Sequence, residues 1–121
     1  MNPLLMMRLQ KLNAEMELAK HRIATANSLY EIIRWSTLSI PVELRMILKP
    51  ASQQVRNQAE CRAKEMTRRQ IDQISRCRSL PEGKAMRNRL MLEWQSMSGY
   101  FPSLFLDAQC RSIRALDEIG K

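Results

Sequence analysis

The chain has 121 residues, of which 45% are hydrophobic and 5% aromatic, and a formal net charge of +8 at pH 7. This length fits one domain and can bury a core without disulfides or metals, and the hydrophobic content excludes wholesale disorder. Leu, Met, Ala, Arg, Glu and Gln dominate, with only three Gly, and these residues favour helix. The sequence therefore predicts a single all-helical domain over residues 1–121.

The first quarter of the chain predicts one long helix over about residues 4–36. Pro3 suits a first helical turn, and Pro41 requires an end before it. Apolar side chains recur at alternating spacings of four and three residues, which is a heptad seam of more than four repeats. The seam contains Leu5, Leu9, Leu12, Met16, Ala19, Ile23, Ala26, Tyr30 and Ile33. It either packs inside its own chain or joins two copies.

The start of this helix is apolar on all sides, because residues 4–7 read "LLMM". One neighbouring surface cannot cover such a segment, and Met-rich surfaces make adaptable binding sites. We therefore expect a self-association or partner contact here, with the chain a homo-oligomer through its first helix; the alternative is that these side chains belong to the core. The residues expected in the contact are Leu4, Leu5, Met6, Met7, Leu9 and Leu12.

Two further segments follow around Pro50. A short helix, "PVELRMILK", begins at Pro41 and should stop before Pro50, because proline breaks a helix interior. Ser52 can then cap a second long helix that runs to about residue 78.

The sequence of residues 79–121 predicts two helices, over about residues 84–98 and 103–119. The letters "SLPE" at 79–82 form a capping box, and Gly99 suits a helix stop. We expect each helix to bury one apolar side: Met86, Leu90, Trp94 and Met97 in the first, and Phe105, Leu106, Cys110, Ile113 and Leu116 in the second. The fold class predicted is an all-α small helical bundle with two long helices, about 4–36 and 52–78, and three shorter ones.

Positive charge is concentrated in the middle of the chain. Residues 51–90 contain ten basic and four acidic groups, and "AECRAKEMTRRQIDQISRCRS" at 59–79 contains six Lys or Arg and three acids. On a helix, Arg62, Arg69 and Arg76 lie within about 40° of one another, and we expect this row to be exposed. Glu60, Glu65 and Asp72 each precede a basic residue by four positions, the favoured spacing for surface ion pairs.

This basic helix has three possible interpretations: a solvated face, a nucleic-acid contact, or a contact with an acidic protein. Three acids cannot neutralise the seven basic groups between Arg56 and Arg78, so a surplus of positive charge remains. Fourteen Arg to six Lys leans toward anion recognition, because the guanidinium holds phosphate or carboxylate in a planar fork. The expected contact residues are Arg56, Arg62, Lys64, Arg68, Arg69, Arg76 and Arg78.

Catalytic and metal-binding motifs are missing from the sequence. His21 is the only histidine and the three Cys are scattered, which provides no tetrahedral metal set, and three Gly cannot form a phosphate-cradling loop. We expect no enzyme activity, no cofactor, no metal and no small-molecule substrate. No apolar run is long enough to cross a membrane, the opening residues do not form a secretory signal, and the odd number of Cys fits the reducing cytoplasm.

These observations favour a non-enzymatic helical binding protein of the cytoplasm, an accessory or regulator of nucleic-acid transactions that acts through its basic helix. The alternative is a protein–protein module, such as an inhibitor, adaptor or chaperone, that docks an apolar surface on a partner. Salt separates the two, because phosphate contacts weaken steeply as salt rises and apolar docking responds little.

Overall fold

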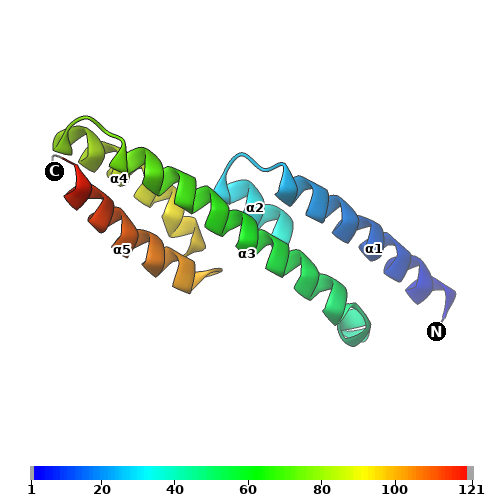
Figure 1. Cartoon of the computed structure of the whole chain (residues 1–121). Helices are drawn as coiled ribbons and strands as arrows, with labels where there is room; N and C mark the ends of the chain where they lie inside the picture. Colours follow the sequence, from blue (N-terminus) through cyan, green and yellow to red (C-terminus); the bar gives the residue numbers. More distant parts are fainter. Residues whose placement is uncertain (1, 120–121) are drawn as a thin grey trace. The chain divides into compact units, whose positions relative to one another are not determined.

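A computed structural model describes residues 2–119 of the chain and shows a small all-α bundle (Figure 1). Helix accounts for 84% of the described residues, and no strand occurs among them. The predicted fold class is therefore confirmed. The helices are α1 (Pro3–Ala24), α2 (Leu29–Ser36), a 3₁₀ turn η1 (Val42–Leu44), α3 (Arg45–Ser75), α4 (Leu80–Trp94), a 3₁₀ turn η2 (Gln95–Met97) and α5 (Pro102–Glu118).

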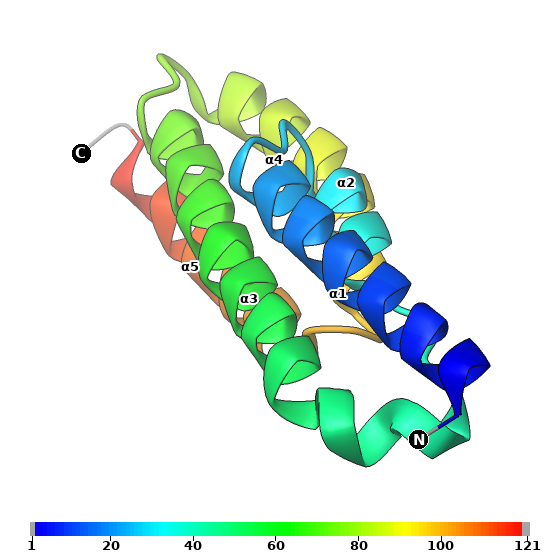
Figure 2. The ribbon, with the colours of Figure 1, turned by 90° about the vertical axis from the view of Figure 1, so that its right-hand side faces the viewer.

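The chain forms two compact units, and α3 contributes to both. The N-terminal unit contains residues 1–27 and 31–62, and the C-terminal unit contains residues 28–30 and 63–121. In the N-terminal unit, α1 and the first half of α3 run side by side in the same direction (Figure 2). Gln58 Nε2 donates to the Lys20 carbonyl at 2.8 Å, and an Arg62 guanidinium nitrogen donates to the Ala26 carbonyl at 2.9 Å.

The predicted helix over residues 4–36 is divided in the structure, because α1 ends at Ala24 and α2 begins at Leu29. Thr25 closes α1 by donating its backbone N–H to the His21 and Ile23 carbonyls. The break changes which side chains face inward. Leu12, Met16, Ala19, Ile23 and Ala26 of the seam are buried as predicted, but Tyr30 is 54% exposed.

A second sequence with the capping-box pattern lies at the new start. Residues 28–31 read "SLYE", with the same pattern as "SLPE" at 79–82. The Glu31 carboxylate accepts the backbone N–H of Asn27 at 3.2 Å, so one of the backbone donors at the turn is satisfied by a side chain. The new helix then buries Leu29 and Ile32 in place of Tyr30.

Pro50 does not end a helix, contrary to the prediction, and Ser52 does not begin one. After the turn η1, α3 starts at Arg45 and continues through Pro50 to Ser75. Its inward side chains explain the continuity, since burial of one unbroken stripe outweighs the cost of the proline; this stripe includes Leu48, Val55, Ala59, Ala63, Met66 and Ile74. The axis bends near the start of α3 (Figure 2), as expected beside a proline that removes one backbone hydrogen bond.

The start of α4 confirms the predicted cap. The Ser79 hydroxyl accepts the backbone N–H of Glu82 at 3.3 Å, and the Glu82 carboxylate accepts the N–H of Arg78 at 3.2 Å. The helix therefore begins at Leu80, four residues before the predicted start. Trp94 and Met97 are buried as expected, and Met86 and Leu90 are half-buried.

The buried face of α5 differs from the prediction. Its inward side chains are Leu104 and the small residues Ala108, Ser112 and Ala115, whereas Leu106 is 60% exposed and Ile113 52% exposed. Small side chains allow α4 and α5 to approach closely. A Cβ atom added at Gly83 of α4 would collide with Ile119 Cδ1 and lie 3.1 Å from Leu116 Cδ2. Gly83 thus leaves room for the large side chains of Leu116 and Ile119, while small residues occupy most of the buried positions of α5.

A polar network crosses the C-terminal unit around Trp94, which is fully buried. The Trp94 indole N–H donates to Gln70 Oε1 at 2.7 Å, and Gln70 Nε2 donates to Glu93 Oε2 at 3.1 Å. Glu93 Oε1 also accepts the backbone N–H of Leu29 at 2.9 Å. This contact satisfies a free donor at the start of α2 and places a negative charge at the positive end of that helix.

Candidate nucleic-acid interface

The predicted basic residues between Arg56 and Arg78 have different environments in the two units. Arg76 and Arg78 follow α3, because this helix ends at Ser75 and not near residue 78 as predicted. Arg56 and Arg62 belong to the N-terminal unit, and the other predicted residues belong to the C-terminal unit. Arg56, Lys64, Arg68, Arg69, Arg76 and Arg78 are exposed, whereas Arg62 is half-buried. The predicted exposure of the row Arg62, Arg69 and Arg76 therefore holds for two of its three members.

Arg62 is a structural residue of the N-terminal unit, which corrects its assignment as an exposed contact residue. Its terminal nitrogen donates to the Ala26 carbonyl, and its Nε is buried. Ala26 lies in the turn between α1 and α2, where the broken helix leaves carbonyls without helical partners. Since the sequence predicts a continuous helix there, it offers no reason for an arginine to turn inward.

Fewer basic side chains are neutralised than the sequence predicts. Of the three expected pairs along α3, Arg69 with Glu65 forms at 2.6 Å. Among residues 2–119, no ion pair joins Lys64 to Glu60 or Arg76 to Asp72. Each such pair would contribute only about 0.3–0.5 kcal/mol on a helix surface, so their absence costs the fold little and leaves the cations available.

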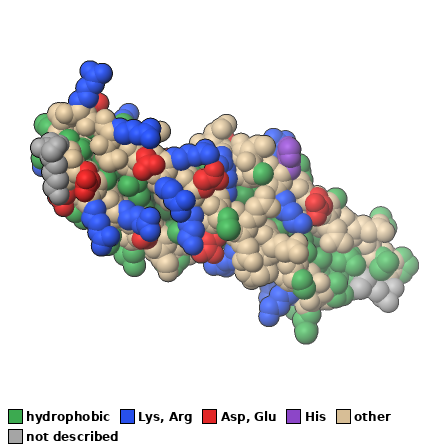
Figure 3. All heavy atoms as spheres, in the orientation of Figure 1, with side chains coloured by type: hydrophobic (Ala, Val, Ile, Leu, Met, Phe, Trp, Pro, Cys, Tyr) green, Lys and Arg blue, Asp and Glu red, His purple; other side chains and the backbone are tan. Residues whose placement is uncertain are grey.

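Four of the predicted contact residues in the C-terminal unit are exposed and have no ion-pair partner within the described part of the chain: Lys64, Arg68, Arg76 and Arg78. Lys and Arg side chains gather over the second half of α3 and over α5 on the face drawn in Figure 3, with a few acids among them. A surface with surplus positive charge attracts polyanions.

A small hollow of about 50 Å³ lies between α3 and α5 in this unit, and we name it the α3–α5 hollow. It is lined by Lys64, Thr67, Arg68, Ile71, Asp107 and Arg111. Arg111 holds the Asp107 carboxylate through its Nε, 3.1 Å from Oδ1 and 3.0 Å from Oδ2. Sequence reasoning had found Lys64 and Arg68 but not Arg111, because no pattern in the sequence relates α5 to α3.

The predicted self-association residues are only partly accessible. Leu4, Met6 and Met7 are exposed, Leu5 and Leu9 are half-buried, and Leu12 is buried in the core of the N-terminal unit. Leu12 therefore cannot contact a second copy in this structure. Other large apolar side chains at this end of the unit are exposed as well, above all Met46 at 89% and Val42 at 70%. Figure 3 shows apolar side chains gathered where α1 and α3 begin.

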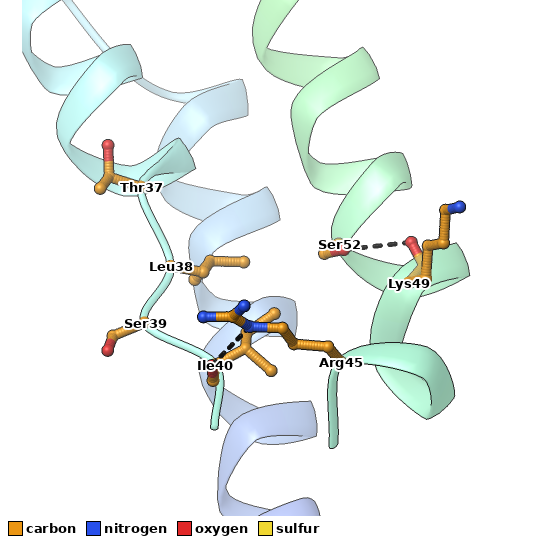
Figure 4. Close-up of a pocket in the computed structure, with 7 residues that line it drawn as sticks. All are labelled: Thr37, Leu38, Ser39, Ile40, Arg45, Lys49 and Ser52. Atoms are coloured by element: carbon orange, nitrogen blue, oxygen red, sulfur yellow. Dashed lines mark hydrogen bonds between the residues drawn. The ribbon is translucent and has the colours of Figure 1, made fainter. Parts of the chain in front are cut away.

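A wider hollow of about 660 Å³, which no sequence pattern indicates, opens in the N-terminal unit beside the segment that links α2 to η1. Arg45 reaches from α3 toward that segment, with its Nε 3.5 Å from the Ile40 carbonyl (Figure 4). Basic, hydroxyl and aliphatic side chains share the lining, which consists of Thr37, Leu38, Ser39, Ile40, Arg45, Lys49 and Ser52.

Within residues 2–119, no group of three or more His, Cys, Asp or Glu side chains is arranged to hold a metal ion. None of the described helices combines the length and the apolar character that crossing a membrane requires. All three cysteines are free thiols, with Cys61 and Cys110 exposed and Cys77 half-buried.

Comparison with known proteins gives no guide to this surface. The chain matches no family model, no curated protein and no solved structure.

Proposed function

We propose that this protein binds the phosphate backbone of nucleic acid through the C-terminal unit and acts there without catalysis, as an accessory or regulator of nucleic-acid transactions. One observation carries the proposal: Lys64, Arg68, Arg76 and Arg78 are exposed and have no ion-pair partner in the described part of the chain. Of the three ion pairs expected along the helix, which would make this face an ordinary solvated surface, only Arg69 with Glu65 forms among the described residues.

Contacts of this kind give affinity rather than sequence selectivity. Lys and Arg side chains that replace condensed counterions on a polyanion gain free energy mainly from counterion release. Base recognition needs side chains directed into a groove from a suitably placed element, and α3 shows no such signature. We therefore expect binding to duplex DNA, single-stranded DNA and RNA with similar affinities, each falling log-linearly with salt.

The test is equilibrium binding of fluorescently labelled duplex DNA, single-stranded DNA and RNA at several salt concentrations. A triple variant, Arg68→Gln, Arg76→Gln and Arg78→Gln, should weaken binding strongly and lower the salt slope. A matched control, Arg8→Gln, Lys11→Gln and Lys49→Gln, removes the same charge from exposed positions of the N-terminal unit and should weaken binding much less. No binding of the unmodified chain to any of the three probes at low salt would refute the proposal.

A second candidate function is docking of the apolar end of the N-terminal unit on another protein or on a second copy of the chain. The supporting observation is the exposure of Leu4, Met7, Val42 and Met46, which water solvates poorly. Sedimentation of the unmodified chain at tens of micromolar tests the homo-oligomer. If the unmodified chain sediments as a monomer, and Met7→Glu does not change its sedimentation, the apolar end does not mediate self-association. Docking on a different protein would then be the remaining form of this candidate function.

We further propose that the protein works in the cytoplasm. Three free thiols, two of them exposed, fit a reducing compartment, where disulfides are rare. Labelling of the thiols in intact cells, followed by mass spectrometry, would show them reduced if this is correct and oxidised if it is not.

A further inference from the structure

We propose that the α3–α5 hollow of the C-terminal unit is a binding site for a single phosphate group. This inference rests on the proposed function, since the phosphate would belong to the backbone of the bound nucleic acid. The site would hold the nucleic-acid backbone at one defined position, whereas the proposed function requires only a diffuse attraction to the whole basic surface.

Each of the two helices contributes a pair of charged side chains, four residues apart, to the lining of the hollow. Lys64 and Arg68 are separated by one turn of α3, and Asp107 and Arg111 by one turn of α5. Residues four apart lie on the same side of a helix, so both pairs line the space between the helices. Three cations therefore converge on one hollow from two different elements.

The charge of the hollow remains positive after its internal pairing. Asp107 is engaged by Arg111 through both carboxylate oxygens. Lys64 and Arg68 make no side-chain hydrogen bond or ion pair with any of residues 2–119. The Thr67 hydroxyl donates to the Lys64 carbonyl at 3.0 Å, so its proton is already used and the two free cations supply the donors for a ligand.

The size of the hollow selects a small group. A cavity needs about 10–15 Å³ to hold one water molecule, so a volume of about 50 Å³ accepts a group of a few heavy atoms and excludes a nucleobase. Thr67 is buried and Ile71 is half-buried beneath it, which keeps part of the wall apolar. Electrostatic attraction is stronger beside such a wall than in open water, and an arginine beside a lysine suits a tetrahedral oxyanion.

The experiment compares two double variants with equal charge changes. Lys64→Gln with Arg68→Gln removes the free cations of the hollow. Lys84→Gln with Arg89→Gln removes one Lys and one Arg from exposed positions of the same unit that do not line it. The readout is affinity for a labelled duplex at several salt concentrations. We expect the hollow variant to bind more weakly than the control, with a salt slope reduced by about 0.9 for the lost phosphate contact.

Equal losses in the two variants would overturn the phosphate site while leaving the proposed nucleic-acid function intact. A second arm reads the site without nucleic acid, by following the backbone amide signals of ¹⁵N-labelled protein during titration with inorganic phosphate. Saturable shifts at residues 64–71 and 107–111 that vanish in the hollow variant and persist in the control support the site, even if no nucleic acid binds. Absence of saturable shifts there in the unmodified chain would overturn it.

Discussion

The two units of this protein place similar residues in opposite roles. Each contains one tryptophan: Trp94 of the C-terminal unit is fully buried and donates to Gln70, whereas Trp35 of the N-terminal unit is half-buried, with the Arg22 and Arg34 guanidinium carbons 5.6 and 5.8 Å from its ring centre. For the arginines of α3, the more buried residue lies in the N-terminal unit and the exposed one in the C-terminal unit. In the N-terminal unit Arg62 turns inward, and in the C-terminal unit Arg68 stays exposed.

The difference shows that an arginine's role depends on what the neighbouring helix leaves unsatisfied. Arg62 lies beside the turn that ends α1, and the Ala26 carbonyl there needs a donor. Arg68 lies beside Asp107 and Arg111 in the interior of α5, where backbone carbonyls are bonded within the helix. A cation that has no structural task remains available for a ligand, and this contrast is the basis of the proposed function.

The largest expected effect separates the two tryptophans. Trp94→Ala should reduce the free energy of unfolding by about 3–5 kcal/mol, because it leaves a large cavity and removes the donor to Gln70. Trp35→Ala should cost clearly less, since its ring is half-buried and an exposed cation–π contact contributes about 0.5–1 kcal/mol. Urea denaturation followed by far-UV circular dichroism measures both, and equal losses would contradict the assignment of Trp94 to the core.

A smaller effect separates the two arginines. Arg62→Ala should destabilise the protein by about 1.5–3 kcal/mol, the usual range for a hydrogen bond to a charged group. Arg68→Ala should change stability by no more than about 0.5 kcal/mol, as expected for an exposed residue without a structural partner. The same denaturation experiment gives both values. If Arg62→Ala proves as mild as Arg68→Ala, the contrast between the units fails.

The two capping boxes offer a matched test within the fold. Glu31→Ala and Glu82→Ala each remove a carboxylate that accepts a backbone N–H, from Asn27 and Arg78 respectively. We expect each to cost about 0.5–2 kcal/mol, the range for loss of a helix cap. A negligible loss at Glu31 with a normal loss at Glu82 would show that the turn between α1 and α2 does not depend on its cap.

The smallest effect on stability is expected at the apolar end of the N-terminal unit. Leu4→Glu with Met7→Glu changes two exposed side chains and should alter the free energy of unfolding by no more than about 0.5 kcal/mol. Met16→Glu, a control at a buried position of the same helix, should unfold the protein or nearly so, because a carboxylate cannot be solvated there. A large loss in the first variant would mean that these residues are core.

Periodicity predicted the helical class and most of the buried seam of α1, because apolar spacing reflects burial directly. It did not locate the end of α1. The seam Leu5–Ile33 remains formally continuous across residues 25–28, and the capping box at Ser28 and Glu31 was the signal that could have shown the break. At Pro50 the local rule for proline gave the wrong boundary, since burial of Leu48 and Val55 on one helix is worth more than the lost hydrogen bond.

The sequence predicts the basic residues that α3 contributes to the candidate site, but not those that α5 contributes. The charge surplus of α3 and the identities of Lys64 and Arg68 follow from the sequence, because a helix fixes which residues share a face. The contribution of Arg111, the inward turn of Arg62 and the hollow between α3 and α5 depend on how distant segments pack. The interior face of α5 was mispredicted for the same reason, since which of its side chains face inward depends on the helices packed against it, for example on the room that Gly83 leaves for Leu116.

The central claim is that nucleic acid binds the C-terminal half of α3, and mapping of backbone amide shifts during titration of the ¹⁵N-labelled protein with a short DNA duplex tests it most directly. We predict saturable shifts concentrated at residues 64–78 and 107–114, with residues 3–24 of α1 unaffected. Shifts concentrated in α1, or no saturable shift at low salt, would contradict the claim.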